Sequence, residues 1–447
     1  MRFKSICLAG LPLILPVILT VIFTAALPIS PQAANMPDVY TMEEAVLRAL
    51  KANPSLESAT YAVDVMESGR RAALSSFGPT IASSYSVTRY DHERQMRNEK
   101  NLVTLAVQAQ QPLFTGFNLL NSYQKAALQV ENQKLQMQQA KLRIIGQVQE
   151  QFLAYLTAEE TLRSTQRSME RAKAQMETAE AAHRVGLRPR QDLLQAEVDY
   201  TNSEARMIQS ETALNLGRAQ LNTLLNLPVD SQTTFVGNLD AKPFDRSLEA
   251  SLDTAHLSRP DLLMAQKALE IAYKDQGIAR SAFYPQVNAI LTWSTTGNTW
   301  RAAGSNLLPA QRNYRQGTAG LQVQWGIFTS GRRYHINQQA RSQISALEAQ
   351  LQSVYNMSAY EIRAYLLSLQ DANRMIAVAE HQVASAMEAY KNASLSYELQ
   401  SATYLDVLTA QSSLANAELS HITTKSEYLK LLSKLYIAMG EINPALR

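Results

Sequence analysis

Apolar residues recur with a helical period through an unusually long stretch of the chain, residues 118–183. This stretch contains no proline, and Gly146 is its single glycine. At the rise of an α-helix it would span about 100 Å, more than an ordinary globular domain holds. Its apolar positions follow two seven-residue registers, Leu128, Leu135, Leu142 and Val130, Met137, Ile144. The helix therefore needs partners on more than one side.

The pattern breaks at the segment from Arg184 to Arg190, which contains Gly186 and Pro189, and resumes from Gln191 to Leu225. The break predicts a helical hairpin over residues 118–225. A second long helix, Arg332 to Tyr397, and a second short one, Tyr404 to Ala438, predict another hairpin over 332–438. Taken alone, this pattern favours a long coiled coil that acts as a spacer.

The chain contains two tandem repeats of the same sequence pattern. Asn53-Pro54-Ser55-Leu56 matches Arg259-Pro260-Asp261-Leu262 at an offset of 260 − 54 = 206, and Phe114-Thr115 matches Phe328-Thr329 at 328 − 114 = 214. We therefore predict two repeats, 35–246 and 247–447, each too long for a solenoid unit. The first ends in a turn-rich linker, 226–246, where Thr233 to Val236 could form a short strand in a belt midway along a tube.

Each repeat begins with a predicted helix, Thr41 to Ser76 or Ser247 to Ala282, which stops before Pro79 or Pro285. A β-hairpin follows, at about 80–111 and about 286–327. Apolar and small polar residues alternate along it, as in Ile81, Ser83, Tyr85 and Val87 against Ala82, Ser84, Ser86 and Thr88. The segments Asp91 to Lys100 and Gly297 to Gln316 are predicted as the hairpin loops.

The first 34 residues predict a secretory signal. Arg2 and Lys4 precede an apolar stretch, and small residues end it near Ala34. An uncleaved anchor helix is the alternative, but Pro12 and Pro16 interrupt the stretch. Cys7, the single cysteine, lies inside this segment, so we expect a mature chain without disulfides or cysteine chemistry.

Strands of about ten residues with one apolar face, in an exported chain, are typical of an outer-membrane β-barrel. Trp293, Trp300 and Trp325 lie in or beside the second hairpin, and other aromatic residues, such as Phe77 and Phe328, lie in or near the strand ends, as an interfacial girdle requires. A water-soluble sandwich with one buried face is the alternative. Four strands cannot close in lipid without unpaired backbone groups, so the barrel must be shared among copies of the chain.

Composition excludes other function classes. Hydrophobic residues make up 46% of the 447 positions, charged residues 18%, and the formal net charge is +3. No basic cluster is interleaved with aromatic residues, so nucleic acid is not an expected partner. The six histidines are isolated and no phosphate-binding loop follows a strand, so we expect no enzyme activity and no cofactor or metal.

The ordered features carry a family resemblance. The signal, the duplicated order of strand hairpin and helical hairpin, the Pro112-Leu113-Phe114-Thr115-Gly116 entry to the long helix and the Val185-Gly186-Leu187 turn resemble the TolC family of outer-membrane efflux channels. The resemblance covers Thr41 to Gly440. It implies a homotrimer with a twelve-stranded barrel, four strands from each chain, in the outer-membrane lipid and continuous with an α-helical barrel through the periplasm.

The same resemblance implies partners and sites. The partners are a periplasmic membrane-fusion adaptor and, through it, an inner-membrane pump of the RND or ABC type, exporting small molecules or polypeptides. Adaptor contact is implied at the hairpin tips, with residues Arg184, Val185, Gly186, Leu187, Arg188, Leu399, Gln400 and Ser401. A periplasmic gate is implied at Asp406, Asp192 and Tyr397. A periplasmic coiled-coil scaffold or adhesin without channel activity is the competing class; it does not explain the strand hairpins.

Three positions depart from the family pattern. Gln400 replaces the glycine found at Gly186, and Ala402 stands where close relatives carry a gate-locking arginine. Thr409 likewise replaces a second acidic residue after Asp406. We therefore expect a closed state held by a bond between Tyr397 and Asp192, or by Arg188 and Arg190. Two interpretations of Asp406 remain open: it caps the helix after Thr403, or it is one member of a three-fold acidic ring.

Overall fold

The computed structural model describes residues 39–91, 101–240, 243–297 and 314–442. The predicted signal peptide, Trp300 and most of both predicted hairpin loops lie outside these ranges. Everything below concerns the described residues, which belong to the unit that begins at Val39.

Eight helices and six strands make up the described chain. The helices are α1 (Met42–Ala52), α2 (Pro54–Ser75), α3 (Asn118–Arg184), α4 (Arg190–Leu224), α5 (Leu248–Ser258), α6 (Pro260–Ser281), α7 (Arg332–Glu398) and α8 (Tyr404–Ala438). The strands are β1 (Val39–Tyr40), β2 (Thr80–Arg89), β3 (Asn101–Phe114), β4 (Thr234–Phe235), β5 (Gln286–Gly297) and β6 (Tyr314–Gln324).

The duplication is visible in the helix boundaries. α3 and α7 both have 67 residues and start 332 − 118 = 214 positions apart, as do α4 and α8, which both have 35. Left-handed backbone positions repeat with the same offset, at Gly186 and Gln400 and at Asn226 and Gly440. The two copies therefore share one backbone plan even where the side chain has changed.

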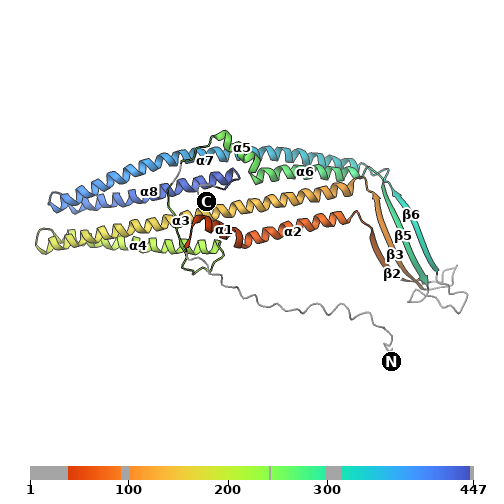
Figure 1. Ribbon diagram of the computed structural model, residues 1–447, viewed down its shortest axis with the longest axis horizontal. Coiled ribbons are helices and arrows are strands. Elements are labelled where there is room, and N and C mark those ends of the chain that lie inside the picture. The colour runs from red at the N-terminus through yellow and green to blue at the C-terminus, as the bar shows by residue number, and fades with distance from the viewer. Residues whose placement is uncertain (1–38, 92–100, 241–242, 298–313, 443–447) are drawn as a thin grey trace, which may run out of the picture. The chain divides into compact units, whose positions relative to one another are not determined.

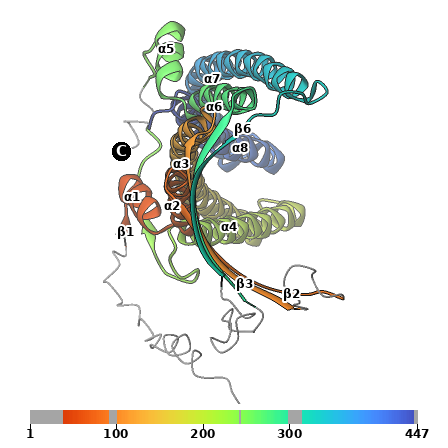
Figure 2. The same cartoon turned by 90° about the vertical axis from the view of Figure 1, so that its right-hand side faces the viewer.

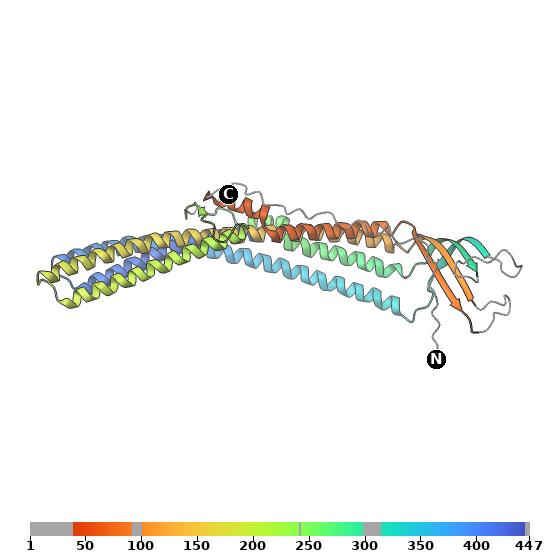
Figure 3. The same ribbon diagram turned by 90° about the horizontal axis from the view of Figure 1, so that it is seen from below.

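The helices lie side by side in two sections that share α3 and α7 (Figures 1 and 3). Toward the sheet the order of contact is α2, α3, α6, α7; toward the hairpin tips it is α4, α3, α8, α7. The layer of helices therefore has α7 at one edge, and α2 and α4 at the other edge.

The predicted helices Thr41 to Ser76 and Ser247 to Ala282 are wrong as single helices. Each is broken, because Asn53 and Arg259 precede a proline and adopt extended backbone (ψ 123° and 116°). Only α2 and α6, of 22 residues each, stack on α4 and α8 alongside the long helices. α1 and α5 lie outside that layer (Figure 2), beside the middle of the long helices (Figure 1).

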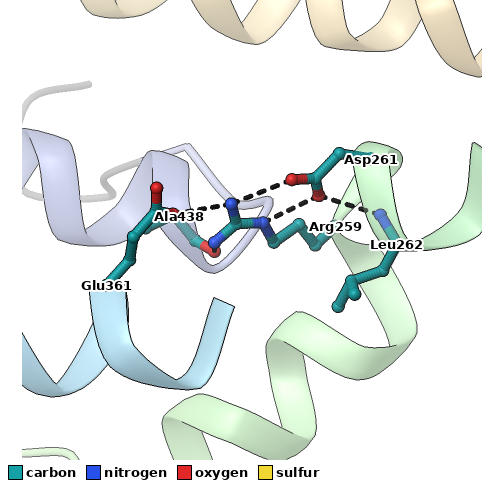
Figure 4. A network of polar contacts seen from close by, with 5 residues as sticks. All are labelled: Arg259, Asp261, Leu262, Glu361 and Ala438. Atoms are coloured by element: carbon teal, nitrogen blue, oxygen red, sulfur yellow. Dashed lines mark hydrogen bonds and ion pairs between the residues drawn. The ribbon is translucent and has the colours of Figure 1, made fainter. Parts of the chain in front are cut away.

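A polar network fixes one of these stacking points (Figure 4). The Arg259 guanidinium donates to both carboxylate oxygens of Asp261 (2.7 and 2.9 Å), to Glu361 (2.6 Å) and to the carbonyl of Ala438, the last residue of α8 (3.3 Å). In the first repeat the Asn53 amide donates to the carbonyl of Leu224, the last residue of α4 (3.2 Å). Each junction thereby satisfies a carbonyl that a helix end leaves free.

The main apolar core lies midway along α3. Phe152 and Tyr155 pack edge-on against Phe235 of β4, with ring centroids 5.7 and 5.2 Å apart. β4 pairs in parallel with β1, so the linker is tied back to the start of the first repeat. The predicted short strand at Thr233 to Val236 is present as β4, and β1 was not predicted.

The four remaining strands form one antiparallel sheet in the order β2, β3, β5, β6. Its register aligns Ile81 with Ala109, Ala109 with Leu291 and Leu291 with Ala319, so the predicted apolar face continues across all four strands. Ile81 and Leu291 are 73% and 58% exposed within a single chain. The neighbouring row, Ala82, Gln108, Thr292 and Thr318, lies on the opposite face.

Both ends of the predicted loop Gly297 to Gln316 are corrected. Gly297 belongs to β5, where it pairs with Val103 of β3. Tyr314 to Gln316 pair with Thr296, Thr295 and Ser294 and belong to β6. Backbone pairing with β5 holds this polar segment in a strand, although its composition is typical of a loop. None of the described helices combines the length and apolar character that crossing a membrane requires.

Candidate functional site at the hairpin tips

Two tight turns close the helical hairpins. Gly186 and Gln400 both have positive φ (77° and 63°), and the following N–H groups, of Leu187 and Ser401, donate to the carbonyls of Ala182 (2.9 Å) and Ser396 (2.8 Å). This is the bond pattern of a Schellman helix end, which needs one left-handed residue. Glycine adopts that conformation without strain, whereas glutamine does not.

The first tip presents apolar side chains to solvent. Val185 is 68% exposed and Leu187 60%, and Arg184 is exposed while paired with Glu180 at 2.9 Å. At the second tip Leu399 is 70% exposed, and Gln400 and Ser401 are exposed as well. The two tips thus offer three large apolar side chains in water, which is unfavourable unless a partner covers them.

Arg188 behaves differently from the other tip residues. Its guanidinium donates to the carbonyl of Tyr397 at 2.7 Å and to that of Ala402 at 3.3 Å, and it lies 4.3 Å from the centroid of the Tyr397 ring. These contacts join the first tip to the second. Arg188 was assigned to the adaptor surface, but here it is half-buried against its own chain.

The expected contact between Tyr397 and Asp192 is also present. The Tyr397 hydroxyl donates to Asp192 Oδ2 at 3.4 Å, a long bond. Tyr397 is 2% exposed and packs with Tyr404, Ala179, Ala196 and Val407. Burial, reinforced by the Asp192 carboxylate, raises the pKa of Tyr397 above its ordinary value, so the phenol stays protonated and can donate.

Asp406 lies in the first turn of α8 and is exposed. Its carboxylate accepts hydrogen bonds from the Thr403 hydroxyl (2.7 Å) and the Thr403 backbone N–H (2.9 Å). These bonds lower the pKa of Asp406, the side-chain bond most. The capping role is therefore present in the single chain, and the acidic ring stays a prediction, as do the gate and docking roles of the other tip residues.

Arg190, the alternative lock residue, is exposed at the first position of α4. Arg188 alone of the two arginines makes the contact between tips. Because the guanidinium reaches Ala402 from the first hairpin, it supplies the second tip with a cation that the sequence lacks at position 402.

Sequence reasoning missed further contacts between the hairpins, among them the hydrogen bond between Asp199 of α4 and Gln411 of α8. The sequence carries a signal for this contact, because Ala196, Asp199, Ser203 and Ser210 follow a heptad register on α4, and the structure buries all four. A carboxylate in that register marks a buried polar position.

No group of three or more His, Cys, Asp or Glu in the described ranges is arranged to hold a metal ion. The chemistry available at the tips is hydrogen bonding, charge and apolar contact.

A family model described as outer membrane efflux protein matches residues 46–227 and 251–441 of this chain. The chain is 21% identical over 422 residues to outer membrane protein TolC of Vibrio cholerae, with 92% of each chain covered. It is 22% identical over 413 residues to outer membrane efflux protein BepC of Brucella suis, covering 90% of this chain and 86% of that one.

Solved structures agree on the fold. The outer membrane protein VceC from Vibrio cholerae superposes with a TM-score of 0.77 at 20% identity, covering 90% of this chain and 96% of that one. The open state of the Neisseria gonorrhoeae MtrE outer membrane channel gives a TM-score of 0.74 at 19% identity, covering 90% and 89%. The predicted fold class, four barrel strands per chain joined to a long helical section built from two repeats, is confirmed.

Proposed function

Because this chain belongs to the outer membrane efflux protein family, we propose that three copies form a channel-tunnel that carries small molecules or polypeptides out of the cell. The channel is the outer component of a tripartite pump or a type I secretion system. It lies in the outer membrane and extends into the periplasm. The family is one of channels and not of enzymes.

The observation that carries this proposal is the sheet. Its apolar face continues over four strands, and its outer strands β2 and β6 each pair on one side only. Unpaired strand edges are untenable in lipid, so the sheet must close with others. Three copies of four strands give twelve, and the polar face lines a wet lumen.

The helical section supports the same assembly. It too ends on uncovered helices, with Met375 and Val378 of α7 (53% and 57%) and Val198 and Ile208 of α4 (58% and 53%) exposed. Joining α7 of one copy to α2 and α4 of the next closes a second ring. A scaffold or adhesin accounts for the helices and leaves the apolar sheet face without a role.

Ion conduction tests the proposal. Purified protein added to a planar lipid bilayer should give stepwise current increases of uniform size, because each inserted trimer adds one water-filled pore. The matched control is a chain lacking the sheet hairpins, 80–114 and 286–324, which keeps the helices and should give no steps. A protein that stays monomeric in mild detergent and never conducts would contradict the channel.

A further inference from the structure

A buried carboxylate joins the two helical hairpins above the tips. Asp199 on α4 is 7% exposed, and its Oδ2 accepts a hydrogen bond from Nε2 of Gln411 on α8 at 3.0 Å. Gln411 is 3% exposed. This bond and the Arg188 contacts tie the first hairpin to the second, so both belong to the surface that separates if the hairpins move apart.

The surroundings suit an ionised carboxylate poorly. Arg206 of α4 is the nearest cation, with Nη2 3.9 Å from Asp199 Oδ1, and its side chain is 55% exposed. A charge pair that is so open to water compensates little of the cost of burying the carboxylate. Burial raises the pKa of Asp199 above its ordinary value, and Arg206 and the Gln411 bond offset this only in part.

Two buried oxygens beside this carboxylate are unsatisfied. Gln411 Oε1 and the Tyr404 hydroxyl have no hydrogen-bond partner among the residues that the structure describes. Tyr404 is 3% exposed, and the Asp199 charge contributes to raising its pKa, which places the two groups close together. Orphaned polar atoms of this kind are rare in native interiors.

Among the residues that the structure describes, the other elements packed around Asp199 bring it no compensating charge. α7 contributes Tyr397, whose ring centroid is 5.7 Å from that of Tyr404, and Tyr390. α3 contributes Ala179, while its Arg171 is engaged with Glu418 of α8 at 3.4 Å. The phenols are neutral at ordinary pH because burial raises the pKa of Tyr397 and Tyr404.

A protonated Asp199 would give the buried Gln411 Oε1 a hydrogen-bond donor. The neutral acid keeps its bond from Gln411 Nε2 and gains an O–H that can donate to Gln411 Oε1, so acid and amide bond through two hydrogen bonds. The ionised form has no donor and leaves the amide oxygen unpaired. Protonation therefore removes a buried charge and satisfies a buried acceptor in one step.

We propose that Asp199 is a pH-sensitive clasp, whose protonation strengthens the contact between the two hairpins and favours the closed state of the tips. The effect on channel opening rests on the proposed function; the protonation itself does not. The strengthening is complete below the ordinary pKa of aspartate and is lost as pH rises through the raised value. Each protomer can change the closed-to-open ratio by at most about tenfold per pH unit.

Single-channel recordings between about pH 4 and pH 8 test the clasp. Wild-type open probability should fall as the solution is acidified. Asp199→Asn is neutral at every pH and, like the protonated acid, offers one donor and one acceptor to the Gln411 amide. A channel with this substitution should remain as closed at pH 8 as the wild type is at pH 4. Glu197→Gln is the matched control, because it removes the same charge from an exposed position two residues away and should keep the wild-type profile.

Infrared difference spectra supply a readout that needs no current. The carbonyl band of a protonated, buried carboxyl should appear on acidification of the wild type and be missing in Asp199→Asn. The clasp is overturned if Asp199→Asn keeps the wild-type pH profile, or if the band is unchanged by the substitution. A wild type that never conducts contradicts the channel, and the infrared band still decides the protonation of Asp199.

Discussion

Gln400 holds the second tip in a conformation that its side chain disfavours. Its φ of 63° matches the 77° of Gly186 at the same place in the first tip. A residue with a Cβ is strained there by about 1–2 kcal/mol, and the extra freedom of glycine in the unfolded chain offsets part of this. We infer that tight closure of both hairpins matters more than the choice of residue.

This inference gives a paired prediction. Gln400→Gly should stabilise the protein by up to about 1 kcal/mol, and Gly186→Ala should destabilise it by a similar amount. A Cβ at Gly186 meets no atom within 4 Å, so the loss would come from the backbone alone. Urea unfolding followed by circular dichroism measures both. A Gln400→Gly midpoint below that of the wild type, or a Gly186→Ala midpoint above it, would show that the tip concerned is not strained.

Two substitutions distinguish the two roles considered for Asp406, which are a helix cap and a member of an acidic ring. Asp406→Asn keeps an oxygen that can accept from Thr403, so the helix start and the thermal midpoint should hardly change. In a trimer it removes three charges, so we expect reduced cation selectivity in bilayers and weaker block by trivalent cations. If Asn leaves both properties unchanged while Asp406→Ala lowers stability, the residue is only a cap.

The pH dependence of Asp406 opposes that of Asp199. Its pKa is lowered by the Thr403 bonds, so its contribution to the α8 start is present at neutral pH and is lost as pH falls through the lowered value. The Asp199 contact becomes stronger as pH falls through the raised pKa of Asp199, which happens at a higher pH. Acid therefore first tightens the hairpin contact and, at still lower pH, loosens the start of α8.

At the scale of elements, the first hairpin tip is the predicted docking surface for the adaptor. Leu187→Glu should abolish export while trimer formation and membrane insertion persist, because a side chain that is 60% exposed can be replaced without unfolding the turn. Pull-down with the adaptor and an export assay measure the effect. Leu257→Glu, at a position 80% exposed on α5, is the matched control.

Normal export by Leu187→Glu would refute the docking assignment. Loss of export together with loss of the trimer would instead show that Leu187 serves assembly. The docking role of Arg188 is less direct, because its guanidinium is committed to Tyr397 and Ala402. Removing it should loosen the tip contact first.

The sequence predicted the elements better than their contacts. Periodicity without breakers placed α8 at Tyr404–Ala438 and α3 and α7 within one residue at their ends. It failed at Asn53 and Arg259, where a proline at the first turn begins a new helix and ends the old one. Local pattern could not distinguish a helix that starts at a proline from one that merely contains it.

Contacts between the hairpins were largely beyond sequence reasoning. Arg188 and Tyr397 are 209 positions apart, and Asp199 and Gln411 are 212 apart. They meet because two hairpins lie side by side, and no local periodicity encodes that registration. The Tyr397 and Asp192 contact was predicted only because a family resemblance supplied it.

At the scale of the whole molecule, the duplication predicts which residues meet between copies. Within one chain α3 packs on α8, and the hydroxyl groups of Thr157 and Ser426 are 2.6 Å apart. If the ring continues with the same geometry, α7 of one copy packs on α4 of the next. Shifting both positions by 214 gives Asp371 (157 + 214) and Thr212 (426 − 214) as the equivalent pair.

Both equivalent residues are exposed in the single chain, as residues at an unfilled interface should be. Asp371→Cys together with Thr212→Cys should form disulfides between copies and give a covalently linked trimer on non-reducing gels, since close Cβ atoms are required for the bond. The chain has no other cysteine than Cys7, which lies in the predicted signal.

The matched control is Thr157→Cys with Ser426→Cys, which should oxidise within one chain and leave the monomer mass unchanged. Each single variant, Asp371→Cys or Thr212→Cys, should remain unlinked. If the Asp371 and Thr212 pair links within the monomer, or stays reduced while the control pair oxidises, the interface between copies is not a repeat of the interface within the chain, and the ring closes through another surface.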